Sequence, residues 1–342
     1  MKLNKLLEQL ITGNDLNHAQ MQHVIKNCMM GALTDAQIAA FLVLMRVKGE
    51  TVEELTAAAE VMQQLAHTID LGTDLIDIVG TGGDGKNTFN VSTASSFVAA
   101  AAGLRVAKHG SHATSSRSGS ADLLLAAGFK LNLSDTALRH CMQQCNMAFL
   151  FGPHFHQALQ QAKPARQQLG VRTLFNLLGP LLNPAGAKKQ VVGVFANHWL
   201  KPIATVLANL GSEHALVIHS HDGLDEISIA APTDIMEYRL GEFKQWTIDP
   251  RDYGCAHPNL DAIVVNNAQQ SLAMIEAVFA GQSGPARDIV LLNTAAALYC
   301  ADICSSFAEA LDKSAKAIDS GQASQRFTQL RDLTRVEESS NE

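Results

Sequence analysis

Apolar residues in the first seventy positions recur at the spacing of one helical face, and nothing there has the character of a strand. Two such segments end near Gly13 and Gly31. Thr34 and Thr51 each stand three residues before a Gln or a Glu, which is the capping-box pattern of a helix start. The pattern therefore predicts a small helical domain over residues 1–70, whose apolar face must pack on the rest of the chain or on a second copy.

The pattern changes at Leu75, where strand-like and helical stretches begin to alternate. An apolar run over 75–79 leads into four glycines, and an alanine-rich helical segment follows over 94–102. Alternation of this kind predicts an α/β domain with a mainly parallel central sheet, whose loops gather at the carboxyl ends of the strands. Further strands are predicted at 104–108, 149–151 and 215–219.

A second link between the two parts is predicted over about residues 166–184. Leucines stand there between Gly-Pro and Asn-Pro breakers, so we expect short helices that cross back to the helical domain. The α/β domain then comprises residues 71–165 and 185–342. Arg166 or Arg172 of the link is predicted to face the cleft, although an arginine in such a place is more often a solvated surface charge.

Length and composition fit two globular domains. The chain has 342 residues, of which 47% are hydrophobic, enough for a large core. Its 26 basic residues stand against 33 acidic ones, and the net charge of −7 gives no basic footprint for nonspecific binding to nucleic acid or to a membrane surface. The sequence shows no signal peptide and no apolar run long enough to cross a bilayer, so we expect a cytoplasmic protein. Six cysteines without C-x-x-C spacing predict buried free thiols.

The loop after the first predicted strand has the composition of an anion site. Its glycines allow backbone N–H groups to approach a ligand, and the start of the next helix favours negative charge, so a phosphate is the expected ligand. Asp84 adds a carboxylate among these groups, which suggests a divalent metal or a sugar hydroxyl. A glycine turn without a ligand is the alternative. Further donors come from Thr88, Asn90, Ser92 and Thr93.

Two familiar phosphate loops are disfavoured. The glycine loop lacks the G-K-[ST] ending of a Walker sequence. Gly80, Gly82 and Gly85 match the G-x-G-x-x-G spacing of a dinucleotide fold, but the following helix is predicted to begin several residues too late. Lys108 also stands roughly where the ribose-binding acid should end the next strand, so a nicotinamide or flavin site is discounted.

A second polar loop follows the second predicted strand, over residues 108–120. It is rich in serine and also holds glycine, histidine and basic residues, and a helix is predicted to begin near Ala121. Because a strand and a helix flank it so closely, a second anion-binding loop is favoured over a low-complexity linker. Both polar loops would open on the same side of the sheet.

The segment from His219 to Ser228 ends another predicted strand and contains the adjacent acids Asp225 and Glu226. Adjacent carboxylates suit Mg²⁺, which takes few protein carboxylates and shares its remaining ligands with substrate phosphates. A solvated turn, or zinc bound by His219 and His221, are the alternatives that the spacing leaves open. Mg²⁺ beside two phosphate loops would serve phosphoryl transfer, displacement of pyrophosphate at a sugar carbon, or phosphorolysis of a nucleoside.

Five motifs in a fixed order together resemble the anthranilate phosphoribosyltransferase family, over the chain up to about residue 330. The resemblance implies a small helical domain and a larger α/β domain with a cleft between them, and a homodimer joined through the helical domains. It implies transfer of the phosphoribosyl group from phosphoribosyl pyrophosphate (PRPP) to the amine of anthranilate, in tryptophan biosynthesis. The motifs are Gly80-Thr81-Gly82-Gly83-Asp84, Asn90-Val91-Ser92-Thr93, Lys108-His109-Gly110 with Ser115-Ser116 and Ser118-Gly119-Ser120, Arg172-Thr173 with Phe175-Asn176 and Gly179-Pro180, and Asp222-Gly223-Leu224-Asp225-Glu226.

The resemblance also implies roles for individual residues, matched by position. Mg²⁺ would be held by Ser92, Asp225 and Glu226. No residue is implied as a nucleophile or a general base, because an aromatic amine can attack without losing a proton first. PRPP would be bound by Gly80, Gly83, Asp84, Thr88, Asn90, Val91, Ser92, Thr93, Lys108, His109, Gly110, Ser115, Ser116 and Ser120.

The acceptor side of the site is where this chain departs from the family pattern. Anthranilate would be contacted by Gly80, Ser111 and Arg166, with His109 at most an orienting donor. Family members usually read Lys-His-Gly-Asn-Arg, whereas Ser111 and His112 stand in the last two positions here. The rival interpretations are a pyrimidine nucleoside phosphorylase-like enzyme, a phosphoribosyltransferase with another aromatic acceptor, and a catalytically silent nucleic-acid-binding relative. The acidic pair and the negative charge oppose the last of these.

Overall fold

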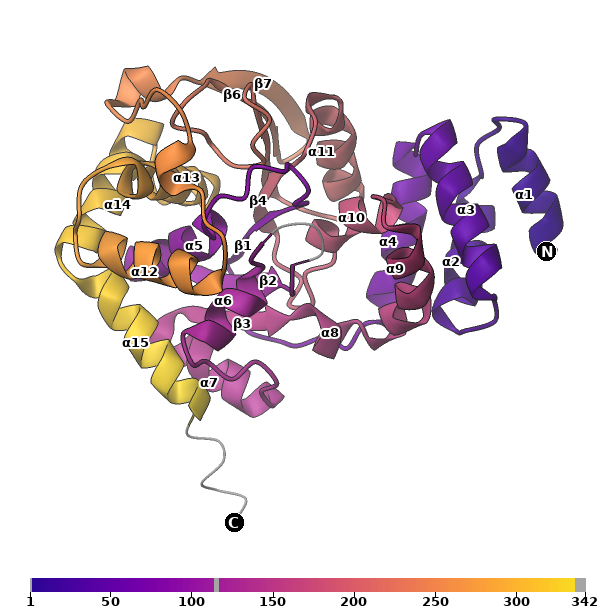
Figure 1. The fold of residues 1–342 in the computed structure, drawn as a ribbon, viewed down its shortest axis with the longest axis horizontal. Coiled ribbons are helices and arrows are strands. Elements are labelled where there is room, and N and C mark those ends of the chain that lie inside the picture. Colours follow the sequence, from indigo (N-terminus) through magenta and orange to yellow (C-terminus); the bar gives the residue numbers. More distant parts are fainter. Residues whose placement is uncertain (1, 114–116, 336–342) are drawn as a thin grey trace, which may run out of the picture.

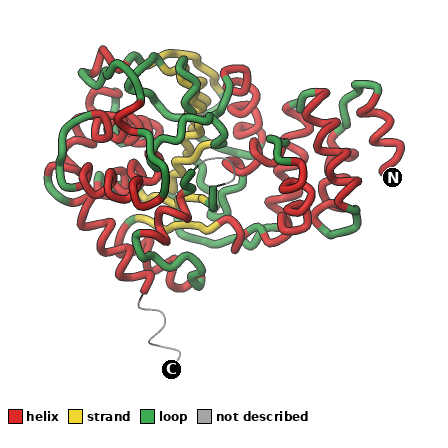
Figure 2. The backbone as a smooth tube through the Cα atoms, viewed as in Figure 1, coloured by secondary structure: helices red, strands yellow, loops and turns green. Residues whose placement is uncertain are grey.

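The computed structural model describes residues 2–113 and 117–335. A small group of helices lies beside a larger part in which helices surround a sheet (Figure 1). The strands run together through the middle of that larger part (Figure 2). The predicted fold class is confirmed, and the six cysteines are buried and free as predicted. Within the described ranges, no helix is long and apolar enough to cross a membrane.

Local capping sets where the helices of the small part begin. The side chains of Thr34 and Thr51 accept the backbone N–H groups of Gln37 and Glu54 at 3.3 and 3.2 Å, so both predicted capping boxes are present. Asn17 caps another helix in the same way, which the sequence had not predicted. The helices are α1 (Leu3–Ile11), α2 (His18–Met29), α3 (Asp35–Lys48) and α4 (Val52–Leu65).

The central sheet has seven strands in the order β3-β2-β1-β4-β5-β6-β7. The first five in this order are parallel, and β6 and β7 pair antiparallel. The sequence predicted β1, β2, β3 and β5 but not the others, because β4 has a polar start and β7 is a largely exposed edge strand. The strands are β1 (Leu75–Gly80), β2 (Arg105–Gly110), β3 (Met147–Phe151), β4 (Lys189–Gly193), β5 (His214–Ser220), β6 (Thr233–Arg239) and β7 (Glu242–Ile248).

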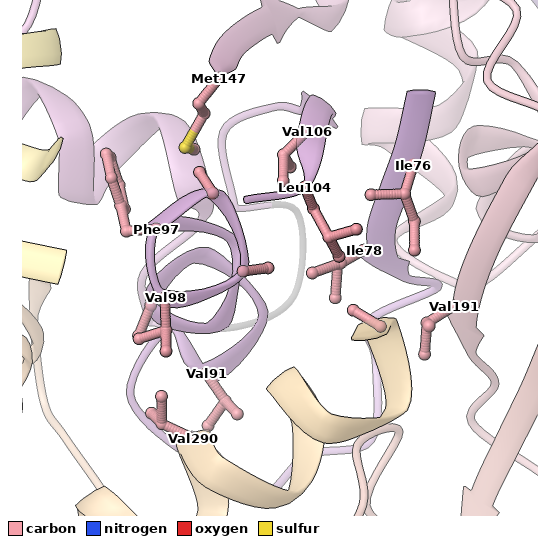
Figure 3. Close-up of a cluster of buried hydrophobic side chains, with 14 of the residues drawn as sticks. Ile76, Ile78, Val91, Phe97, Val98, Leu104, Val106, Met147, Val191 and Val290 are labelled. Atoms are coloured by element: carbon pink, nitrogen blue, oxygen red, sulfur yellow. The ribbon is translucent and has the colours of Figure 1, made fainter. Parts of the chain in front are cut away.

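Two hydrophobic cores lie on opposite faces of the sheet, because neighbouring residues of a strand point to opposite sides. Val191 of β4 belongs to the first core and Val192 to the second. Phe97 and Val98 of α5 belong to the first core together with Ile76 and Ile78 of β1 (Figure 3). The helices of the larger part are α5 (Val91–Ala101), α6 (Ser120–Ala126), α7 (Asp135–Cys145), α8 (Gly152–Phe155), α9 (Lys163–Leu169), α10 (Leu174–Leu178), α11 (Leu200–Asn209), α12 (Ala268–Phe279), α13 (Pro285–Cys300), α14 (Phe307–Asp319) and α15 (Gln322–Arg335).

The second core joins the helical part to the sheet. Ala165 of α9 and Leu177 of α10 are buried in one cluster with residues of α2, α3 and α4. The assignment of these short helices to the helical domain stays a prediction. Ile203 of α11 and Val217 of β5 belong to the same core. The helical part therefore packs part of its apolar surface against the rest of this chain. The domain boundary near residue 70 stays a prediction.

The strand order places the loops after β1 and β4 at a topological switch point. β1 lies between β2 and β4, so the chain leaves β1 toward one side and later returns on the other. In open α/β sheets, the loops that follow two such strands diverge and leave a crevice in which ligands bind. The glycine loop follows β1, so the fold brings it to this crevice.

Glu54 ties three segments of the helical part together from a buried position. Its Oε1 accepts the N–H of Leu16 at 2.8 Å, and its Oε2 accepts the N–H of Thr51 at 2.9 Å. The Nζ of Lys48, which is only 4% exposed, lies 2.9 Å from the same Oε2. One carboxylate thus links the end of α3, the start of α4 and the connection before α2.

We expect Glu54→Ala to lower the free energy of unfolding by about 3 kcal/mol, because the N–H groups of Leu16 and Thr51 lose their acceptor and Lys48 keeps only its ion pair with Asp15. The measurement is urea unfolding followed by circular dichroism. The matched control is Glu53→Ala on the same helix, whose carboxylate accepts only an exposed N–H of His18 and should cost less than about 0.5 kcal/mol. Equal losses for the two variants would contradict this role of Glu54.

Candidate functional site

The site is built around Asp225, in the loop between β5 and β6, which folds back over the ends of β1 and β4. Asp225 Oδ2 accepts the N–H of Gly82 at 2.8 Å. A Cβ on Gly80 would lie 2.6 Å from the same oxygen, and a Cβ on Gly193 would overlap the carbonyl oxygen of Asp225. Only glycine at these two strand ends lets the acidic loop come so close.

Three carboxyl groups meet beside the glycine loop. The carboxyl group of Asp84 lies near that of Asp225, and Glu226 Oε1 accepts the N–H of Ser92 at 3.2 Å. Burial and the nearby Asp84 raise the pKa of Asp225 to about 7. Burial and the adjacent Asp225 raise the pKa of Glu226 to about 8. The negative charge of these three carboxylates is therefore only partly balanced by nearby positive groups.

Lys108 supplies the buried positive charge closest to this cluster. Its Nζ donates to the carbonyl of Ile78 at 2.7 Å and to Ser92 Oγ at 3.3 Å. Burial lowers the pKa of Lys108, and the carboxylates of Asp77 and Glu226 oppose that effect. The lysine therefore lies where β1, β2 and α5 meet, and its ammonium group can bind a phosphate or pair with the nearby carboxylates.

The donor set fits Mg²⁺ better than zinc. Asp225, Glu226 and the hydroxyl of Ser92 offer oxygen ligands, which Mg²⁺ prefers. His219 Nδ1 lies 2.7 Å from the carbonyl of Val194 and His221 Nε2 lies 3.0 Å from Asp234, so one nitrogen of each ring has a partner within the protein. Across the part of the chain that is described, no group of three His, Cys, Asp or Glu side chains could hold a metal alone. Further ligands must come from a bound molecule.

The glycine loop takes a conformation that side chains rarely adopt. Gly82, Gly83 and Gly85 have φ of 62°, 79° and 74°, in the left-handed region that favours glycine. The N–H of Lys86 returns to Asp84 Oδ1 at 3.1 Å, which closes the loop on itself. The loop is therefore a tight backbone feature rather than an extended linker.

The helix after this loop begins at Val91, three residues before the predicted start, so the prediction of a later start was wrong. Ser92 and Thr93 thus lie in its first turn, where backbone N–H groups have no partner within the helix. Asn90 makes no side-chain cap, and Glu226 accepts the Ser92 N–H in its place. The Thr93 hydroxyl is fully buried and has no hydrogen-bond partner among the described residues.

Two residues predicted to contact PRPP, Val91 and Asn90, already have partners within the protein. The Val91 side chain lies in the first core (Figure 3), and its N–H donates to the carbonyl of Phe89 at 2.7 Å. The Asn90 amide donates to the Ser118 carbonyl at 3.1 Å, and its oxygen accepts from the hydroxyls of Ser118 and Ser271 at 2.9 and 2.8 Å. Asn90 thereby joins the two polar loops. Thr88 lies nearby, bridged to Val264.

Asp122 of α6 organises the second polar loop. Its Oδ2 accepts the N–H groups of Ala113 and Gly119, each at 2.9 Å, and its Oδ1 lies 2.6 Å from His112 Nδ1. Within the loop, the hydroxyl of Ser120 reaches the carbonyl of Ser111 at 3.4 Å. A Cβ on Gly110 would overlap that same hydroxyl, and a Cβ on Gly119 would overlap the backbone of Ala113. The predicted residues Ser115 and Ser116 lie outside the described residues.

His109 is buried and neutral beside the second loop. Burial, together with the nearby His156 ring, lowers its pKa to about 3. Its Nε2 is buried and has no hydrogen-bond partner in the described ranges. Its backbone N–H donates to Asp77 Oδ1 at 3.1 Å, and Asp77 Oδ2 accepts from Asn183 at 2.8 Å. The sequence did not predict these contacts of Asp77. The one feature that could have indicated them is an acidic residue inside an otherwise apolar strand.

Arg166 lies apart from the acidic cluster, on α9. Its guanidinium sits over the ring of Phe175, 5.3 Å from the centroid. Burial alone lowers its pKa, and no carboxylate of the described residues offsets that burial. The structure thus brings most of the predicted phosphate and metal residues together, but it leaves Arg166 with only an aromatic contact. The residues gathered at the strand ends are Gly80, Gly83, Asp84, Ser92, Lys108, His109, Gly110, Asp225 and Glu226.

Comparison with known proteins matches both parts of the chain. Residues 72–324 match the a/b domain of a glycosyl transferase family, and residues 4–66 match the helical bundle domain of such a family. The anthranilate phosphoribosyltransferase of Legionella pneumophila (strain Paris) is 65% identical over 98% of each chain. The crystal structure of anthranilate phosphoribosyltransferase from Thermus thermophilus has a TM-score of 0.90 at 35% identity, covering 96% of this chain and 99% of that one. The same enzyme from Saccharomyces cerevisiae, solved in complex with PRPP and Mg, has a TM-score of 0.88 at 26% identity and 97% coverage of each chain.

We expect Gly193→Ala to lower the free energy of unfolding by at least about 2 kcal/mol, because the new methyl group overlaps the backbone of Asp225. Urea unfolding measures the loss. Gly179→Ala is the matched control, since its φ is −45° and a Cβ there would meet nothing within 4 Å. The close approach of Asp225 would be refuted by two variants of equal stability.

Proposed function

The chain belongs to the anthranilate phosphoribosyltransferase family, and from that premise we propose that it transfers the 5-phosphoribosyl group of PRPP to the amine of anthranilate. The products are N-(5-phosphoribosyl)anthranilate and pyrophosphate, in tryptophan biosynthesis. The observation that carries the proposal is the buried acidic pair Asp225 and Glu226 between two polar loops at the switch point of the sheet. The phosphorylase alternative has less need of such a pair and is not favoured.

The pyrophosphate and ribose 5-phosphate groups of PRPP are bound by the two polar loops. The backbone of Gly80 and Gly83, the first turn of α5 with Ser92 and Thr93, and the Lys108 ammonium present donors to anionic oxygens. Mg²⁺ held by Ser92, Asp225 and Glu226 would offset the negative charge of the departing pyrophosphate. The remaining predicted contacts are Asp84, Thr88, Asn90, His109, Gly110 and Ser120, with Val91 acting only through the helix that it anchors.

No residue is needed as a nucleophile or a base. The anthranilate nitrogen attacks C1 of the ribose with its lone pair while the bond from C1 to the pyrophosphate oxygen breaks, and the nitrogen releases its proton afterwards. His109 is neutral because of its burial, so it cannot donate a proton to the leaving group near neutral pH. Rate therefore comes from positioning and from electrostatic stabilisation of the leaving group.

Arg166 binds the carboxylate of anthranilate in this proposal. A partly buried guanidinium without an acidic partner is suited to a carboxylate ligand, because the fork of N–H donors matches its two oxygens. Gly80 and Ser111 complete the acceptor side, where Ser111 is exposed and offers one hydroxyl.

We also infer a homodimer formed through the helical part. Large hydrophobic side chains are exposed there: Val47 is 80%, Met30 67% and Ile11 59% accessible. Exposed large apolar side chains on a small domain favour a protein interface. The cytoplasmic location expected from the sequence stays a prediction.

Changing Asp225 and Glu226 together to alanine should lower kcat/KM by about 100-fold or more at limiting Mg²⁺, because the ligands that bring the cation to the pyrophosphate are gone. The assay is loss of anthranilate fluorescence on adding PRPP and Mg²⁺. Glu242→Ala on the exposed edge strand is the control and should leave the rate unchanged. Wild-type turnover in the presence of EDTA would refute the metal assignment.

Arg166→Ala should raise the KM for anthranilate about tenfold or more, because a charged hydrogen-bonded pair is lost, while the KM for PRPP changes little. Steady-state kinetics with each substrate varied in turn measures both constants. Lys163→Ala, an exposed residue on the same helix, is the matched control. An unchanged KM for anthranilate removes Arg166 from the acceptor site.

A further inference from the structure

Arg172, in the connection between α9 and α10, contacts the glycine loop. Its Nη1 donates to the carbonyl oxygen of Gly83 at 3.2 Å. The same guanidinium lies over the ring of Phe195, 4.3 Å from the centroid, at the end of β4. Arginine can do both at once, because its planar group stacks on a ring and still donates from its edge.

The position of Arg172 is set from the helical part of the molecule. Arg46, in the last turn of α3, donates through Nη1 to the backbone carbonyl of Arg172 at 2.8 Å. The α9 and α10 helices on either side are buried in the second core with the helical part. A continuous set of contacts thus runs from α3 through Arg172 to the glycine loop.

This contact orients a peptide group of the loop. In a planar trans peptide, the carbonyl of one residue and the N–H of the next point in opposite directions. Holding the carbonyl of Gly83 toward Arg172 therefore turns the N–H of Asp84 the opposite way. The preceding N–H of Gly82 is already held by Asp225 at 2.8 Å. The peptide groups before Gly82 and after Gly83, two glycines with positive φ, are therefore each held by a side chain from another segment.

We propose that Arg172 is a positioning residue for PRPP, which holds the glycine loop in its anion-binding conformation from the helical part of the molecule. This inference rests on the proposed function. Arg172 needs no contact with the reacting atoms, since its effect passes through the Gly83 carbonyl to the Asp84 N–H. Loss of the guanidinium leaves a flexible glycine loop, and PRPP binding then has to order that loop at a cost in affinity.

The test compares Arg172→Ala, Arg172→Lys and the wild type. We expect Arg172→Ala to raise the KM for PRPP about tenfold, as for a lost hydrogen bond from a charged donor, with less than about twofold change in the KM for anthranilate. Arg172→Lys keeps a donor but loses the stacking on Phe195, so its KM should be intermediate. Val171→Ala, at an adjacent exposed residue, should match the wild type.

A second readout does not depend on turnover. PRPP with Mg²⁺ should raise the unfolding temperature of the wild type, and the rise should be smaller for Arg172→Ala, while the two unliganded proteins unfold at the same temperature. An unchanged PRPP constant in Arg172→Ala overturns the inference. So does an equal rise in both KM values together with a lower unfolding temperature, which would indicate general loosening.

Measurements on the wild-type protein distinguish a failure of this inference from a failure of the proposed function. If it fails to consume anthranilate while PRPP with Mg²⁺ still stabilises it, the proposed acceptor is wrong and the Arg172 inference is decided by the stabilisation alone. If it consumes anthranilate and Arg172→Ala behaves identically, only the Arg172 inference is overturned.

Discussion

The close approach of the Asp225 loop to the ends of β1 and β4 is the constraint on which the rest of the site depends. It requires glycine at positions 80 and 193, because a Cβ at either would meet Asp225. It brings two acids within reach of the glycine loop and of the first turn of α5. A parallel sheet alone would leave these groups on separate loops. Because Gly80 and Gly193 have no side chains, the Asp225 loop can contact the ends of β1 and β4 directly. This contact makes the switch point of the sheet a compact site.

The second core gives the site its other wall. The helical part, α9, α10, α11 and one face of the sheet share a single buried cluster, so the segment carrying Arg166 and Arg172 is anchored on both sides. Arg172 then spans from this segment to the carbonyl of Gly83. A change in the packing of the helical part is therefore felt at the glycine loop, although the two lie far apart in the sequence. The packing of the second core and the polar contacts of Arg172 both hold this segment beside the glycine loop.

Features with a local cause were predictable from the sequence. Capping boxes at Thr34 and Thr51, the strand before the glycine loop and the acidic pair could all be read directly, because each depends on neighbours a few residues away. Features that depend on distant partners were missed. The start of α5 is stabilised by Glu226, which accepts the N–H of Ser92 from 134 positions further along the chain. The brace between Asp77 and Asn183 and the network of Asn90 with Ser271 likewise join segments that no sequence spacing relates.

The electrostatics of the site explain why these distant braces are needed. Carboxyl groups of like charge are destabilising when buried, and Asp84, Asp225 and Glu226 lie together with Lys108 as the nearby buried cation. The fold offsets part of this cost with backbone donors: Gly82 to Asp225, Ser92 to Glu226, and the positive end of α5. A cation that enters the site would therefore be attracted by carboxylate charge that the protein itself does not balance. In the proposed function, the stability given up at the strand ends is recovered as affinity for a metal shared with a phosphate-rich ligand.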